Sequence, residues 1–240
     1  MNHSLHIRLE TSPAQHAKLL ELQAAFAQVC NALAPVVQQT ACWNRVALHH
    51  LAYRSMRQQF PALGSQMICN ALYSVSRASR WVYQHPASPF NLTRLAGKQL
   101  PRLQFLPQSP VYFDRHTLSL RDGVASMYTL DGRMRFNLPL APADEHRFRT
   151  ARLREIVLLR REGQFQLSFT FGEGPEQPAG LPALPQQAAG PASAGAAGSA
   201  ATDLPHYLLV LHGAEPAEVI PMSTQTLPQP AAPQFTQSPT

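Results

Sequence analysis

The spacing of the apolar residues changes once along the chain, and this change limits the possible folds more than any other sequence feature. Residues 4–10 alternate between apolar and polar side chains, which predicts a half-buried strand. Residues 13–33, 43–59 and 63–83 carry apolar residues three and four apart, as helices with one buried face do. After His85-Pro86, short runs rich in Val, Phe, Tyr and Leu follow. We therefore expect one strand, three helices and then several strands.

Local signals mark the ends of these elements. Ser12 can cap the first helix, Pro13 fits the first helical position, and Gln15 completes a capping box. Pro35 is expected to end or bend that helix. Asp131-Gly132 predicts a two-residue hairpin turn, and Glu162-Gly163 predicts another turn. The expected strands cover residues 103–106, 111–113, 117–120, 125–130, 133–138, 154–159 and 164–170.

Strands at this spacing are typical of a small barrel or sandwich. The fold class we predict is α+β: a small β-barrel whose first strand is separated from the others by a three-helix insertion. The expected boundaries are 1–11 and 101–171 for the barrel and 12–100 for the helices. Residues 172–240 are rich in Pro, Ala, Gly, Gln and Ser, which predicts a largely disordered tail. Within it, residues 207–211 form an apolar run, which we interpret as a docking segment rather than a last strand.

Charge is distributed very unevenly. All twenty Lys and Arg residues lie at or before Arg161, where only eight acidic residues accompany them, a net charge of about +12. The remaining 79 residues carry no Lys or Arg and a net charge of about −6. Between Gln23 and Phe113 there are eight basic residues and no acidic one. Codon bias can explain why eighteen of the twenty are Arg, but it does not explain the missing acids, so we expect a polyanionic partner.

Two stripes on the predicted helices are candidate nucleic-acid contacts. His50, Arg54 and Arg57 are spaced four and three apart on the second helix. Tyr73, Arg77 and Arg80, followed by Gln84, lie on one side of the third helix. Two arginines can contact a sugar–phosphate backbone while the tyrosine ring stacks on a base. Each stripe is equally consistent with a solvated helix face.

Catalytic and metal-binding patterns are not found in the sequence. Cys30, Cys42 and Cys69 are far apart and form no C-x-x-C pair. His49 and His50 are adjacent, so on a helix they point in different directions. The central acids lie in probable turns or in the tail: Asp114, Asp122, Asp131, Asp144 and Glu145. We expect binding rather than catalysis, with no catalytic residue, no metal and no cofactor. With no apolar stretch of eighteen residues, we also expect a cytoplasmic protein without a membrane partner.

Several modest motifs, in order over residues 4–171, resemble the first half of TnpB proteins and type V CRISPR effectors. They are the residue 5–11 strand with Ser12-Pro13-Ala14-Gln15, then Phe26-Ala27-Gln28-Val29-Cys30-Asn31, Asn44-Arg45-Val46-Ala47-Leu48-His49, Ser65-Gln66-Met67, Tyr128-Thr129-Leu130-Asp131-Gly132-Arg133 and Glu162-Gly163-Gln164-Phe165. In that family the barrel is a wedge domain and the helices are a recognition lobe. Both bind the guide RNA and the DNA beside its target. With this resemblance, the expected nucleic-acid contacts also include Arg45, Arg133 and Arg135.

The resemblance ends where the family's nuclease domain begins. That domain, RuvC, opens with Asp-x-Gly and contains a four-Cys zinc element, but this chain continues into the Pro- and Ala-rich tail. The resemblance therefore implies a nuclease-lacking protein that binds a guide or structural RNA and double-stranded target DNA, with a possible protein partner on its tail. The alternatives are a subunit of a split RNA-guided nuclease, an RNA-independent DNA-binding protein and a transposon remnant.

Overall fold

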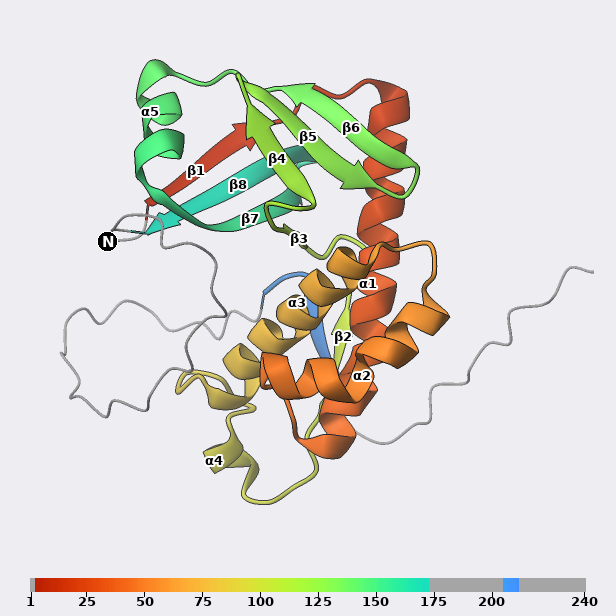
Figure 1. Cartoon of the computed structure of the whole chain (residues 1–240). Helices are drawn as coiled ribbons and strands as arrows, with labels where there is room; N and C mark the ends of the chain where they lie inside the picture. The colour runs from red at the N-terminus through yellow and green to blue at the C-terminus, as the bar shows by residue number, and fades with distance from the viewer. Residues whose placement is uncertain (1–2, 173–204, 212–240) are drawn as a thin grey trace, which may run out of the picture.

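The computed structural model describes residues 3–172 and 205–211 (Figure 1). Each of the three predicted helices is present, together with two short ones. The helices are α1 (Pro13–Thr40), α2 (Arg45–Gln59), α3 (Ser65–Gln84), α4 (Leu92–Leu95) and α5 (Pro142–Thr150). The strands are β1 (His3–Arg8), β2 (Arg102–Phe105), β3 (Val111–Phe113), β4 (Leu118–Arg121), β5 (Val124–Thr129), β6 (Gly132–Asn137), β7 (Arg152–Arg161), β8 (Gln164–Gly172) and β9 (Leu208–Leu211). The predicted disordered tail lies mostly outside the described residues.

The strands form antiparallel sheets, which confirms the α+β class. One sheet has the order β1-β8-β7-β3, a second β4-β5-β6, and a third β2-β9. These sheets do not close into a barrel over the described residues, contrary to the expected architecture. The chain leaves the first sheet after β3, where Asp114 accepts hydrogen bonds from the backbone N–H groups of His116 and Thr117. This tight turn starts a new sheet at β4 instead of extending the old one.

The first strand joins the last long strands although the helices separate them in sequence. β1 pairs with β8 in a register that runs from His3 opposite Phe171 to Arg8 opposite Gln166. The pairing continues beyond β1, because Leu9 N–H donates to the Phe165 carbonyl at 2.9 Å. Ile7 and Leu9 are buried on one face of this sheet, as the predicted alternation requires.

Helix α1 begins as predicted and ends later than predicted. Ser12 and Gln15 form the reciprocal capping box, at 3.2 and 2.9 Å. Pro35 was expected to end or bend the helix; it lies inside the helix, which continues to Thr40, so it does not end it. By length and composition α1 can cross a membrane, a test that core helices also pass, and half of its most apolar window is buried. It packs against α3 and β2.

A row of side-chain amides fastens α1 to the segment around β2. Asn31 donates from Nδ2 to the Phe105 carbonyl at 2.8 Å and accepts from the Phe105 N–H at 2.7 Å. About two helical turns from Asn31 on either side, Gln23 donates to the Ser109 carbonyl and Gln38 donates to the Leu100 carbonyl. Asn31 thus replaces a neighbouring strand on one edge of β2, and β9 occupies the other edge.

Strand β9 corrects the preferred interpretation of residues 207–211. Leu208–Leu211 pair with β2, from Phe105 opposite Leu208 to Arg102 opposite Leu211. The run is therefore a strand, the alternative that sequence reasoning ranked second. Figure 1 shows it lying beside β2 among the helices, and it belongs to neither of the two larger sheets.

Two other local predictions have definite outcomes. Glu162 and Gly163 both have positive φ, 50° and 78°, so the predicted turn is confirmed. At the other hairpin, Thr129 lies opposite Gly132, so the two-residue turn is Leu130-Asp131, one residue earlier than predicted. Helix α5 was not predicted, because it presents a single apolar anchor, Phe148, and therefore has no apolar period.

The burial of β9 gives a testable difference between neighbouring positions. Leu208 is 3% exposed and Leu209 is 45% exposed. We expect Leu208→Asp to lower the free energy of unfolding by about 3 kcal/mol, because an unpaired carboxylate enters the apolar contact with β2. Leu209→Asp, the matched control, changes it by less than about 0.5 kcal/mol. Urea unfolding of both variants checks this, and equal effects would mean that β9 is not docked.

Candidate nucleic-acid interface

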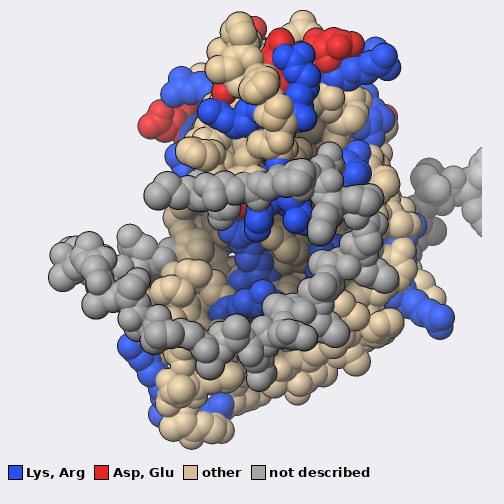
Figure 2. Space-filling model, turned by 60° about the vertical axis from the view of Figure 1, so that its left-hand side comes forward, with Lys and Arg blue, Asp and Glu red and all other residues tan. Residues whose placement is uncertain are grey.

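The segment without acidic residues forms most of the helical part of the protein. It includes α2, α3, α4 and β2. Figure 2 shows Lys and Arg side chains gathered in a recessed band across one face, while the acidic side chains visible in that view lie chiefly at the top. Several described bases form ion pairs with acids outside this segment: Lys18 with Asp131, Arg77 with Glu155, Arg121 with Asp122 and Arg147 with Asp144. The charge imbalance in the sequence is therefore retained on the folded surface.

The outer face of α3 forms a shallow groove of about 450 Å³. We call it the α3 groove; it is lined by Arg77, Arg80, Trp81, Gln84, His85 and Pro86. The ring of Trp81 stacks on the ring of His85, with centroids 5.5 Å apart and planes 11° apart. Helical geometry explains the pair, since residues four apart lie on the same side of a helix. The groove thus places two guanidinium groups beside a partly exposed indole.

A cluster of tyrosines lies at the inner end of this groove. The Tyr73 hydroxyl donates to Glu155 at 2.9 Å, and Arg77 forms an ion pair with the same carboxylate. The Tyr73 ring meets the Tyr112 ring edge to face at 5.4 Å. The Arg45 guanidinium carbon lies 5.4 Å from the centre of the Tyr73 ring. The structure thus brings together three of the predicted site residues, from α2 and α3, and adds partners from β3 and β7.

The Tyr73 ring, which we expected to stack on a base, is half-buried in this structure. Its ring is packed and its hydroxyl is engaged, and burial, together with the nearby Glu155 carboxylate, raises its pKa. Trp81 is the aromatic residue that lines the α3 groove, and sequence reasoning missed it. Its position four residues after Arg77 and four before His85 was the available signal.

The basic stripe of α2 divides into exposed and structural members. His50 and Arg54 are exposed. Arg57 donates to the Leu63 carbonyl and so helps to close the turn between α2 and α3. Neighbouring His49 stacks on Tyr53, with centroids 4.5 Å apart.

Arg133 and Arg135 lie on β6, in a different sheet from the helical residues. Arg133 donates to the Ser126 hydroxyl at 2.9 Å and to the His116 carbonyl at 3.1 Å, so it ties the hairpin to the preceding turn. Arg135 is exposed opposite Ser126. The structure does not bring these two arginines into the α3 groove.

Several basic residues that sequence reasoning did not select are exposed on the strand side, among them Arg154 and Arg115. Arg154 lies on β7, and a Cβ atom on Gly172 would fall 1.8 Å from its Nε, so the guanidinium crosses directly over that glycine. Arg115 follows β3 and is also exposed. Neither position has a periodic pattern around it, so the sequence carried no signal for them.

Titratable groups of the described residues do not converge as metal ligands do. No group of three or more His, Cys, Asp or Glu side chains is assembled in the part of the chain that the structure describes. Cys30 is buried between helices, and burial raises the pKa of its thiol to about 12. The geometry present in these residues is suited to holding a polyanion.

The buried phenols and thiol give a pH dependence. Burial raises the pKa of Tyr73, Tyr83, Tyr112 and Tyr207 above 10.0 and that of Cys30 above 9.0. The folded chain therefore keeps protons that the unfolded chain releases, and stability falls as pH rises from about 9 to 12. We expect the urea midpoint to drop steadily between pH 9 and pH 12. Tyr83→Phe removes one contributor and should flatten this fall, and a midpoint that stays constant would contradict the assignment.

Comparison with known proteins leaves the site to be interpreted from its own chemistry. No protein-family model matches this chain, and no curated protein matches it. The charge of the surface and the geometry of the α3 groove are therefore the basis for assigning a function.

Proposed function

We propose that this protein binds nucleic acid through the α3 groove and the exposed arginines around it, and that it does not cut what it binds. The observation that carries the proposal is the surface formed by residues 24–112, which contains eight basic and no acidic side chains. An exposed surface of one sign repels itself, so it is favoured where an oppositely charged partner covers it. Arginine suits phosphate especially well, because its guanidinium donates two parallel hydrogen bonds.

The groove has the features that favour a flexible or single-stranded segment. Arg77 and Arg80 are one turn apart and can contact successive phosphates. Trp81 offers an aromatic face to an unstacked base, a contact that accepts any base. Glu155 neutralises part of the Arg77 charge, so Arg80 carries more of the electrostatic attraction.

In its finer form, the proposal is a nuclease-lacking TnpB-like protein with a wedge-like strand domain and a helical recognition insertion. Its ligands would be a guide or structural RNA and a double-stranded DNA target, with a further protein partner for the tail. The pairing of β1 with β8 supports this form, because α1, α2 and α3 leave the first sheet and the chain returns to it. A separate RuvC chain would make the protein one half of a split nuclease.

The test measures the affinity of the full chain for a structured RNA and a DNA duplex as salt is varied. We expect log affinity to fall linearly with log salt, with a slope of about −3 or steeper from several phosphate contacts. Both ligands should remain intact in Mg²⁺. Absence of binding at low salt contradicts nucleic-acid binding, and Mg²⁺-dependent cleavage contradicts the non-cutting assignment. Binding of the duplex alone would favour the RNA-independent alternative.

A further inference from the structure

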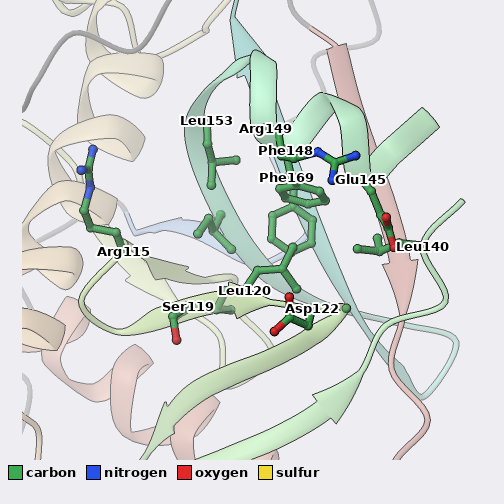
Figure 3. Close-up of a pocket in the computed structure, with 13 residues that line it drawn as sticks. Arg115, Ser119, Leu120, Asp122, Leu140, Glu145, Phe148, Arg149, Leu153 and Phe169 are labelled. Atoms are coloured by element: carbon green, nitrogen blue, oxygen red, sulfur yellow. The ribbon is translucent and has the colours of Figure 1, made fainter. Parts of the chain in front are cut away.

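A cavity of about 720 Å³ lies where the two larger sheets fail to join. One wall is β4, the opposite wall is β7 and β8, and α5 lies over one side (Figure 3). A volume of this size is in the range of sites that hold small organic ligands. The cavity is separate from the α3 groove, with which it shares no lining residue.

The inside of the cavity is apolar and partly aromatic. Phe148 from α5 packs edge to face on Phe169 of β8, with centroids 4.9 Å apart. Figure 3 shows these two rings side by side, with Leu120 of β4 near them. Leu153 also lines the cavity and is 38% exposed. A flat apolar ligand would cover these surfaces.

The polar lining of the cavity combines both signs of charge. Arg115 and Arg149 supply donors, whereas Asp122 and Glu145 supply acceptors. An acyl chain with a single anionic head would bring a further negative charge beside the carboxylates of Glu145 and of Asp122, which pairs with Arg121. A heteroaromatic ring with donors and acceptors on its edge matches the mixture, and a nucleobase has this chemistry.

Strand β7 connects the cavity with the α3 groove. Its pairing with β8 shifts register between Leu153 and Glu155, which marks a β-bulge. Leu153 lines the cavity, Arg154 is exposed beside Gly172, and Glu155 pairs with Arg77 of the α3 groove. Bulges of this kind often re-aim side chains next to binding sites. Three consecutive residues thus lead from the groove to the cavity.

We propose that this cavity binds one unstacked nucleobase of the nucleic acid that the α3 groove and the exposed arginines around it bind. The inference rests on the proposed function, because that function brings a strand to Arg154 and the α3 groove. Arg115 and Arg149 would contact the base edge or its phosphate, and the apolar walls would cover the ring faces. The cavity then contributes the preference for one base, whereas the α3 groove and the exposed arginines around it contribute most of the affinity.

The experiment follows the methyl NMR signals of Ile156 and Leu120 in the full chain during titration. The probes are adenosine, guanosine, cytidine and uridine 5′-monophosphate, with ribose 5-phosphate and decanoate as comparisons. We expect at least one nucleotide to shift these signals saturably and ribose 5-phosphate to leave them unchanged. Leu153→Trp fills the cavity from its exposed side. It should lower the affinity for that nucleotide about tenfold or more, as losing one base contact does.

The matched control is Leu92→Trp, which adds the same ring at an exposed leucine of α4, distant from both sheets. It should leave the nucleotide affinity unchanged. The proposal is overturned if no nucleotide shifts the two signals, if ribose 5-phosphate shifts them equally, or if decanoate alone does. If RNA binds with a steep salt dependence but no nucleotide shifts the Ile156 and Leu120 methyl signals, the cavity is not a nucleobase site. The proposed function then still stands. Nucleotide binding without RNA binding would reject the proposed function instead.

Discussion

Replacing Arg45, Arg54 and Arg80 together with glutamine is expected to lower the affinity for RNA about 100-fold at low salt. All three are exposed and lie on the segment without acids, and among the described residues none of them forms an ion pair. Removing three phosphate contacts should also make the slope of log affinity against log salt shallower by about 2. Fluorescence anisotropy over a salt series measures both quantities.

The matched control makes the same change in net charge elsewhere. Lys18, Arg121 and Arg147 are paired with Asp131, Asp122 and Asp144, so their replacement by glutamine removes bases that are already partnered. We expect this variant to lose less than about tenfold in affinity and to keep most of its salt slope. Equal losses in the two triple variants would show that net charge alone attracts the RNA and that residues 24–112 have no special role.

The second large effect is expected for Asn31→Ala. The Asn31 amide satisfies both the N–H and the carbonyl of Phe105, on the edge of β2 that faces α1. Alanine leaves these two partly buried backbone groups without partners, which should lower the free energy of unfolding by about 2–4 kcal/mol. Gln28→Ala is the control, since Gln28 is exposed on the same helix. Urea unfolding monitored by circular dichroism compares them, and similar midpoints would mean that the amide pairing contributes nothing to stability.

The elements that the sequence predicted well are those with long periodic patterns. Helices α1, α2 and α3 follow from apolar residues three and four apart, and the capping box at Ser12 defines where α1 begins. Pro35 does not end α1, because a proline signal is local, whereas the helix also packs against α3 and β2. Helix α5 was missed because one phenylalanine gives no period.

Strand pairing was predictable only in part, because it depends on long-range contacts. Nothing near β2 indicates that Asn31 would occupy one of its edges and β9 the other, 103 residues or more along the chain. The open arrangement of the sheets follows from the Asp114 turn and from α5, whose roles appear only in three dimensions.

The candidate site shows the same division. The stripe on α3 was predicted from spacing, and the structure places Arg77 and Arg80 in one groove. Tyr73 contacts Glu155 and Tyr112, which lie far along the chain and were not predictable as its partners. Arg115 and Arg154 are exposed on a turn and a strand, where no helical period marks them.

The central claim is that the basic surface formed by residues 24–112 binds an RNA in the cell. The most direct measurement is to purify the full chain from its native host and to sequence the RNA that accompanies it. The account predicts one abundant RNA species, encoded beside the gene, that stays bound in moderate salt. A heterogeneous RNA mixture that moderate salt washes off, or no RNA at all, would contradict it.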